Sequence, residues 1–237
     1  MRNSALTVSL VALLAGGVQA ASVAINFQRS PNGEQPMSPG DVAGVIAQSN
    51  WNNVTGGAAN AGSIADLVTD AGANSGVSVE WAGDTSWSNN NGTANGHNKM
   101  MGGYLDHTGT VGAKATFTNI SYDTYDIYVY FGSDGNGRTG QVTDGTTSFS
   151  YTTNSATGGD FPNQYTLTTD TTGSNPAANY AVFSDLSGAT QVIDIIRGSS
   201  NSGIHGIQIV DTSVVPEPGS LALLIPGIGM MFLRRRR

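Results

Sequence analysis

Short segments in which apolar and polar residues alternate recur between residues 21 and 213 of this 237-residue chain. In the clearest of them, 125–131, Tyr, Ile, Val and Phe occupy every second position. Successive side chains of a strand point to opposite faces of a sheet, so this period of two predicts strands with one buried face. The expected strands are 22–27, 77–81, 111–118, 125–131, 164–169 and 179–183, with a hairpin over 140–153 and a closing hairpin formed by 191–197 and 204–210.

Turn signals separate these segments. Asn-Gly occurs four times, beginning at residues 32, 91, 95 and 136, and Asp144-Gly145 supplies the turn of the first hairpin. These dipeptides tolerate the positive φ values that tight β-turns require. No long amphipathic helix is expected, and segments 42–46 and 64–71 stay open between short helix and strand. The sequence therefore predicts an all-β domain, a jelly-roll-like β-sandwich whose first and last strands lie close together.

The N-terminus is typical of a secretory signal peptide. Arg2 precedes an apolar run over 5–14, and small residues lead up to Ala20. This order predicts export and cleavage after Ala20, with cleavage after Ala21 as the alternative. The expected organisation is a signal peptide over 1–20, a sandwich domain over 21–213 and a C-terminal segment over 214–237.

The C-terminal segment has three parts in a fixed order. The first, Val215, Pro216, Glu217 and Pro218, is expected to be extended, because each proline restricts its own φ and the residue before it. Residues 219–233 carry no charge and predict a short transmembrane helix of about 22 Å. The chain then closes on Arg234, Arg235, Arg236 and Arg237, and such a cationic end stays on the cytoplasmic side.

This three-part order resembles the PEP-CTERM sorting signal of Gram-negative bacteria over about the last 23 residues. The resemblance implies processing near Pro216 to Pro218 by a membrane-embedded, exosortase-type enzyme. It also implies export through the inner membrane and a transient membrane anchor. The final place would be the cell surface or the exopolysaccharide matrix of a biofilm. A plain C-terminal membrane anchor is the alternative.

The net charge of the central domain limits the classes of molecule that it can bind. The two ends hold half of the ten basic residues, so between residues 21 and 215 five basic residues face sixteen acidic ones. A net charge of about −11 repels phosphate backbones, which argues against nucleic acid as a partner. The chain has no cysteine, which excludes disulfides and thiolate chemistry.

The stretch 125–151 resembles the central strands of malectin-like and galactose-binding-like sandwiches. An apolar strand is followed by a Gly-rich loop with Arg138 and by a hairpin over 141–151. The resemblance implies a jelly roll and adds sugar binding to the candidate functions. The loop also begins like a calcium loop at Asp134, but Arg138 and Gly145 stand where an EF-hand needs ligands. A structural calcium ion held elsewhere stays an alternative, and no other cofactor is expected.

Two clusters of Trp and Asn suggest polysaccharide as a candidate partner. Aromatic rings stack on the C–H faces of sugars, and amide side chains bond the hydroxyls. Trp87 with Asn89 and Asn90, and Trp51 with Asn52, combine these residue types. The alternative is that Trp51 and Trp81 belong to the core.

Motifs for catalysis and metal binding are missing from the sequence. It contains no Gly-x-Ser-x-Gly nucleophile elbow. The three histidines, His97, His107 and His205, lack the close spacing of a zinc site. We therefore expect no enzyme but an exported surface or matrix protein, with a carbohydrate-binding module as the alternative.

Overall fold

The computed structural model describes residues 21–28, 36–54, 61–89, 94–155, 160–199 and 201–213. The expected signal peptide, the expected C-terminal sorting segment and the transmembrane helix predicted within it lie outside these residues. Within the described ranges the chain is built of strands and one short helix, α1 (Gly96–Met100). No helix in those ranges is long and apolar enough to cross a bilayer.

The strands belong to two sheets. The strands of the first sheet are β1 (Ser22–Phe27), β2 (Asn52–Val54), β5 (Thr85–Ser88), β6 (Gly103–His107), β8 (Tyr125–Gly132), β12 (Tyr180–Leu186) and β14 (Ser202–Asp211). Those of the second sheet are β3 (Ala61–Ile64), β4 (Ser78–Gly83), β7 (Ala113–Thr118), β9 (Thr139–Thr143), β10 (Ser148–Thr153), β11 (Ala177–Ala178) and β13 (Thr190–Arg197).

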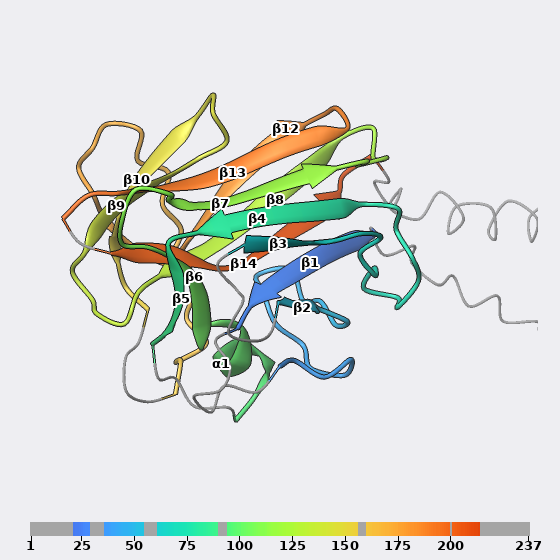
Figure 1. Ribbon diagram of the computed structural model, residues 1–237, viewed down its shortest axis with the longest axis horizontal. Helices are drawn as coiled ribbons and strands as arrows, with labels where there is room; N and C mark the ends of the chain where they lie inside the picture. The colour runs from blue at the N-terminus through green and yellow to red at the C-terminus, as the bar shows by residue number, and fades with distance from the viewer. Residues whose placement is uncertain are drawn as a thin grey trace, which may run out of the picture. The chain divides into compact units, whose positions relative to one another are not determined.

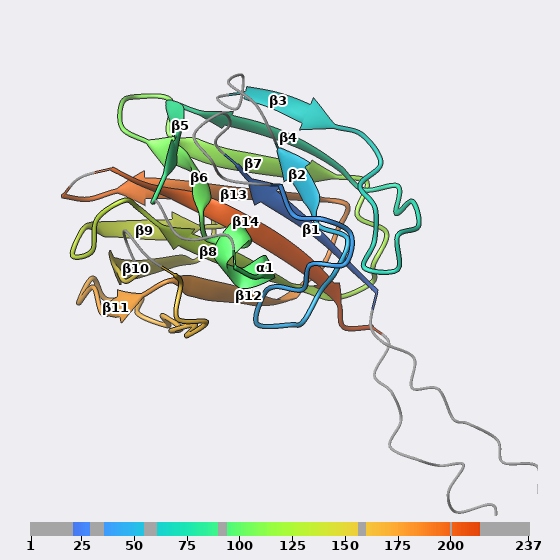
Figure 2. The same cartoon turned by 90° about the horizontal axis from the view of Figure 1, so that it is seen from below.

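The two sheets pack face to face, which confirms the all-β sandwich (Figure 1). The first has the order β12-β8-β14-β1-β2, with β6 beside β14 and β5 beside β6. The second has the order β11-β10-β9-β13-β7-β4-β3. Figure 2 shows the two layers from below, with α1 near the first sheet.

Alternation of apolar residues places the core between the sheets. Tyr125, Ile127, Val129 and Phe131 of β8 are fully buried and belong to one hydrophobic cluster with residues of the second sheet. The predicted inward face of 77–81 is confirmed as well, since its apolar residues are buried. Strand β7 begins at Ala113 and leaves Val111 exposed, so the predicted start of that strand is wrong.

The first and last strands lie side by side, as predicted. β1 pairs antiparallel with β14, from Ser22 opposite Val210 to Asn26 opposite Gly206. Beyond this pair, the backbone N–H of Asp211 donates to the carbonyl oxygen of Ala21 at 2.9 Å. Both ends of the sandwich chain therefore lie at one end of the strands.

The predicted closing hairpin is wrong. β13 pairs with β7 and β9 in the second sheet, whereas β14 pairs with β1, β6 and β8 in the first. The connection between them crosses from one sheet to the other. Alternation of apolar residues does not distinguish a hairpin within one sheet from a connection between the two sheets. In both arrangements each strand has an apolar face toward the core.

Of the other local predictions, the strand over 164–169 is wrong and the hairpin over 140–153 is confirmed. Segment 164–169 forms no strand and contributes a single bridge, Leu167 with Tyr180. Segment 42–46 is a turn closed by a bridge between Ala43 and Gln48. The hairpin over 140–153 is confirmed, with β9 and β10 joined at the predicted turn.

A second, smaller apolar cluster lies on the outer face of the first sheet. Tyr130 of β8 points away from the main core and packs with Trp51, Met100 and Phe161. Its hydroxyl accepts a hydrogen bond from the backbone N–H of Val45 at 2.7 Å. The 37–51 segment and α1 are thereby fixed onto this face, so the first sheet is buried on both sides.

Candidate functional site

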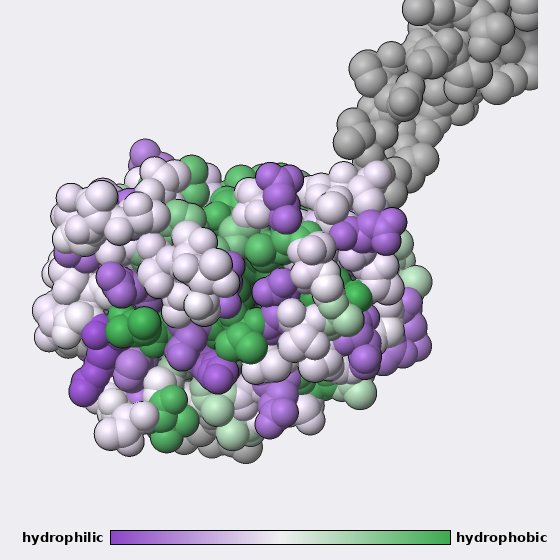
Figure 3. Space-filling view, turned by 90° about the horizontal axis from the view of Figure 1, so that it is seen from above, coloured by the Kyte–Doolittle hydropathy of each residue, from purple (hydrophilic) through white to green (hydrophobic). Residues whose placement is uncertain are grey.

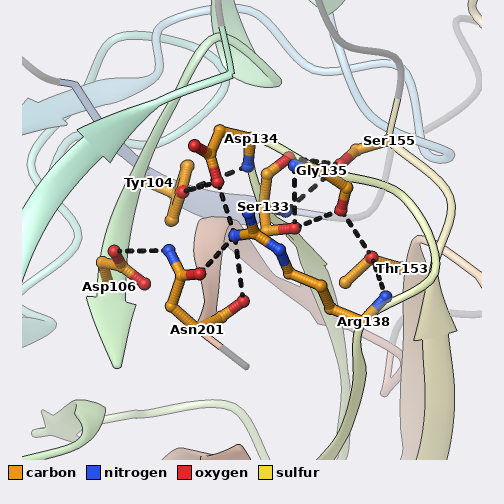
Figure 4. Close-up of polar contacts among 9 residues, drawn as sticks. All are labelled: Tyr104, Asp106, Ser133, Asp134, Gly135, Arg138, Thr153, Ser155 and Asn201. Atoms are coloured by element: carbon orange, nitrogen blue, oxygen red, sulfur yellow. Dashed lines mark hydrogen bonds and ion pairs between the residues drawn. The ribbon is translucent and has the colours of Figure 1, made fainter. Parts of the chain in front are cut away.

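The end of the sandwich opposite the chain ends carries a cluster of polar side chains. In the β8–β14 pair, Tyr125 lies opposite Asp211 near the chain ends, and Gly132 lies opposite Gly203 at the far end. The far end is formed by the loop after β8, the connection before β14, and strands β5 and β6. We call its five central residues the distal polar cluster: Tyr104, Asp106, Asp134, Arg138 and Asn201 (Figure 4).

Arg138 lies at the centre of the distal polar cluster. Its Nη1 lies 2.5 Å from Oδ1 of Asp134 and also donates to Oδ1 of Asn201. Asn201 in turn donates from Nδ2 to Oδ2 of Asp106 at 3.2 Å. The Tyr104 hydroxyl donates to Oδ1 of Asp134 at 3.3 Å and accepts from its backbone N–H at 3.1 Å. These contacts connect three segments that are far apart in the sequence.

The Gly-rich loop after β8 is held by hydroxyl groups from the end of β10. Thr153 donates from Oγ1 to the carbonyl of Gly135 at 2.8 Å. Ser155 Oγ donates to the carbonyl of Ser133 at 3.1 Å and accepts from its N–H at 3.2 Å. The loop therefore has internal partners for its backbone. Across the described residues, no three His, Asp or Glu side chains come together as a metal site.

Burial dominates the electrostatics of Asp106. The residue is only 1% exposed, and its Oδ1 has no hydrogen-bond partner. Burial raises the pKa of Asp106 to about 6. The hydrogen bond from Asn201 opposes this rise in the pKa, and the negative charge of Asp134 adds to it.

His205 lies beside this cluster in β14 and is fully buried. Its Nδ1 is 2.7 Å from the carbonyl oxygen of Gly103, so Nδ1 carries the proton, because a carbonyl only accepts. Nε2 has no partner, and burial lowers the pKa of His205 to about 4. The ring meets Tyr104 edge-on, with centroids 5.3 Å apart. His205 is thus a buried residue of the last strand.

Trp87 is the tryptophan that the fold leaves accessible. It lies on β5 directly opposite Tyr104 of β6, and opposite residues of an antiparallel pair share a face. Its side chain is 39% exposed. Asn89 is buried and donates to the carbonyl of Met101, so it holds the end of α1 rather than facing solvent. Asn90 lies outside the described residues.

Trp51 and Asn52 serve the fold rather than an open surface. Trp51 is 4% exposed, and its indole N–H donates to the carbonyl of Gln48 at 3.0 Å. Asn52 donates to the carbonyls of Ala24 and Val68 and accepts from the N–H of Val68. Of the tryptophans in the two predicted Trp-Asn clusters, Trp87 is therefore exposed and Trp51 is buried.

Two shallow hollows lie on the second sheet. One, of about 220 Å³, lies between β9 and β13, where Ile196 is exposed beside Gln141 and Asn175. The other, of about 230 Å³, crosses β3, β4 and β7 and contains Ser63, Glu80 and Thr116. Figure 3 shows the side of the molecule on which β12 and β13 lie in Figure 1, where polar groups surround a recess with apolar side chains.

Sequence reasoning missed most of the distal polar cluster. Asp134 and Arg138 attracted attention as a Gly-rich loop, but Tyr104, Asp106 and Asn201 stand in no recognisable motif. They meet through strand pairing between residues about a hundred positions apart, for example Asp106 opposite Gly203. The chain matches no protein-family model, and no curated protein matches it in sequence.

Proposed function

We propose that this protein is an exported, non-catalytic component of the cell surface or of an exopolysaccharide matrix, sorted by its C-terminal segment. The observation that carries the proposal is the order of Val215 to Pro218, an uncharged stretch and four arginines, which resembles a PEP-CTERM signal. An exosortase-type enzyme is the proposed processing partner. The membrane holds the chain before processing, and a jelly-roll-like sandwich is the exported part.

The geometry of the sandwich supports a tethered role. Its two chain ends meet at one end of the strands, and β14 runs ten residues, about 33 Å, to the other end. A chain held through its C-terminal segment thus has the distal polar cluster and Trp87 far from the point of attachment. The polar groups of that cluster bond mainly to one another, which suits a rigid display surface better than a reacting centre.

Cell fractionation tests the sorting signal. Alanine replacement of Pro216, Glu217 and Pro218 is expected to leave the full-length chain in the membrane fraction of a host with an exosortase-type enzyme. The unaltered chain should be shortened and released. Pro226→Ala, a proline change in the same tail but outside the motif, should be processed normally. Release of the triple variant at the normal rate would refute this sorting route.

Carbohydrate binding is a second candidate function, favoured by the exposure of Trp87 beside polar side chains. An indole at the surface can stack on a sugar ring, and Trp87 is 39% exposed, whereas Tyr104 and Asp106 of neighbouring β6 are buried. A glycan array with the exported protein should show binding that Trp87→Ala weakens by about tenfold or more. Trp87→Phe should keep most of the affinity, and Val111→Ala, at another exposed apolar residue, should keep all of it. If Trp87→Ala binds glycans with full affinity, the proposed binding site at Trp87 is wrong.

A further inference from the structure

The outer face of the second sheet carries a row of polar side chains across three strands. Ser63 of β3 lies opposite Glu80 of β4, and Glu80 lies opposite Thr116 of β7. Directly opposite residues of antiparallel strands share a face, with Cβ atoms about 4.5 to 5.5 Å apart. Ser78 and Thr118 form a second row, two residues away along β4 and β7. We call these five residues the Glu80 patch.

The Glu80 patch faces solvent. Val79 and Phe117 alternate with its residues and are buried in the core, so the patch lies on the opposite side of the sheet. Ser63 and Glu80 are exposed, and the other three side chains are half-buried. All five line the hollow of about 230 Å³ that crosses β3, β4 and β7. Because clefts that enclose drug-sized ligands measure about 300 to 1,000 Å³, this hollow suits a short stretch of a polymer.

The side chains of the Glu80 patch keep their capacity for hydrogen bonds. Within the part of the chain that the structure describes, neither the Glu80 carboxylate nor a hydroxyl of the patch takes part in a hydrogen bond or ion pair. Lys114, two residues from Thr116, lies directly opposite Asp194 and is placed to offset that carboxylate. A carboxylate only accepts hydrogen bonds, whereas a hydroxyl both donates and accepts. The patch is therefore an anionic acceptor flanked by hydroxyl groups.

Charge complementarity selects the class of ligand. An ammonium group donates three N–H groups to a carboxylate and carries the opposite charge, which gives the stronger, charge-assisted hydrogen bonds. The net charge of about −11 between residues 21 and 215 also attracts cationic ligands to the domain. The flanking hydroxyls of the patch match the hydroxyls of a sugar. An amino sugar combines both kinds of group in one unit.

We propose that the Glu80 patch binds a polysaccharide with free amino groups, of the glucosamine type. The ammonium of one unit pairs with Glu80, and the units on either side bond to Ser63 and Thr116. Neighbouring strands are about 4.7 to 4.9 Å apart, close to the length of one unit in an extended β-1,4-linked chain, so successive units meet successive strands. This inference rests on the matrix role proposed above and names the class of polysaccharide involved.

Calorimetric titration of the exported protein with three oligosaccharides tests the ligand class. The β-1,4-linked hexamers of glucosamine, N-acetylglucosamine and glucose differ in carrying an ammonium, an acetamide or a hydroxyl group on each unit. At about pH 6 and about 150 mM salt, we expect the glucosamine hexamer to bind about fivefold or more tighter than either neutral hexamer. Equal affinities for the three hexamers would overturn the proposal.

Two charge-matched variants locate the site. Glu80→Gln should weaken binding of the glucosamine hexamer about fivefold, whereas Asp185→Asn should leave it nearly unchanged. Asp185 is also exposed, but it lies in β12, where Phe183 packs against Phe149 of β10 with ring centroids 5.2 Å apart. This edge is far from β3 and β4 in the strand order of the second sheet. Equal losses in the two variants would show attraction to the whole acidic domain and overturn the site.

A lysine hexamer separates an amino sugar from a basic protein segment. It carries ammonium groups without ring hydroxyls, so it should bind more weakly than the glucosamine hexamer. Tighter binding of the lysine hexamer would overturn the polysaccharide and favour a basic protein as the partner.

Failure of this inference is distinguishable from failure of the proposed function. No binding of any hexamer would overturn the inference and leave the sorting route standing, since cell fractionation measures processing independently. Normal release of the Pro216, Glu217 and Pro218 triple variant would overturn the sorting route whatever the titrations show.

Discussion

Asp106 and His205 have opposite effects on how the free energy of unfolding depends on pH. The folded-state pKa of Asp106 is about 6, above the ordinary 3.8 of its carboxyl, because the residue is buried. The folded-state pKa of His205 is about 4, below the ordinary 6.5, for the same reason. Between pH 4 and 6, folding therefore takes up a proton at Asp106 and releases one at His205. As pH rises through this window, Asp106 lowers the free energy of unfolding and His205 raises it.

Asp106→Asn should expose the contribution of His205. Without the opposing carboxyl, the free energy of unfolding should rise with pH between 4 and 6.5 more steeply than in the unaltered protein. The extra slope should reach about 1.4 kcal/mol per pH unit. Urea unfolding at pH 4, 5, 6 and 7 measures it, with Asp123→Asn as the control for a lost carboxyl. Parallel profiles for Asp106→Asn and the unaltered protein would contradict the assignment.

Gly203 marks a close approach of two backbones. A Cβ at this position would collide with the carbonyl oxygen of Leu105 and lie 2.7 Å from Cδ2 of Tyr104. Because a backbone oxygen of a paired strand yields little, Gly203→Ala should lower the free energy of unfolding by about 3 kcal/mol.

Gly145→Ala is the matched control for this glycine substitution. Gly145 faces open space at a φ of +89°, so only the strain of a positive φ applies, about 1 kcal/mol. Chemical denaturation of the two variants and the unaltered protein measures both losses in the free energy of unfolding. Equal losses at the two glycines would show that the β6–β14 contact is looser than the structure indicates.

At the scale of elements, Asp84 fixes the connection between β6 and β7. Its carboxylate accepts hydrogen bonds from the N–H groups of Thr108, Gly109, Val111 and Gly112, at 2.8 to 3.2 Å. Burial raises the pKa of Asp84, but the backbone hydrogen bonds outweigh burial and leave this pKa below the ordinary value. The connection therefore depends on an ionised side chain from a different segment.

Asp84→Asn should loosen this connection. An amide keeps one acceptor oxygen and lacks the charge, so the free energy of unfolding should fall by about 1 to 3 kcal/mol at neutral pH. Because the pKa of Asp84 is depressed on folding, its stabilisation is present above pH 3.8 and is lost as pH falls further. The difference between variant and parent should therefore vanish in acid. Amide hydrogen exchange at Gly109 and Val111 should be faster in the variant, and unchanged in Asp123→Asn.

The elements that local chemistry determines were predictable. In the β9–β10 hairpin, Asp144 Oδ1 accepts from the N–H groups of Thr146 and Thr147, and Gly145 adopts the required positive φ. The β13–β14 connection looked similar in sequence. It crosses between sheets because Ile195 and Ile207 find partners in distant strands, which a local pattern does not encode.

The same distinction between local sequence and long-range pairing applies to the residues of the candidate site. Trp87 stands among polar neighbours in the sequence, and it is the exposed tryptophan among those of the described residues. Trp51 has similar neighbours but is buried, because the segment before it folds over the outer face of the first sheet. Asp106 and Asn201 become neighbours through the pairing of β6 with β14 alone. Residues joined by long-range pairing leave no spacing to recognise.

On the scale of the whole molecule, the pairing of β1 with β14 closes the sandwich on itself. Ala21 and Asp211 share a hydrogen bond, so a short linker can join Ser213 to Ala21 without disturbing a strand. Once the two ends are joined, the chain of the domain can be opened at another position without changing which strands pair. Folding depends on which strands pair, since loop closure changes the free energy only slowly with loop length.

A circular permutant tests this closure. With residues 213 and 21 joined by a Gly-Ser linker and new ends between Asp144 and Gly145, the chain should fold with the circular dichroism spectrum and cooperative melting of linear 21–213. The cut falls in an exposed turn and breaks no strand. New ends between Tyr128 and Val129 would split β8, which pairs with both β12 and β14, and that permutant should not melt cooperatively. Cooperative folding of the second permutant would show that β8 is not the central strand on which the two layers depend.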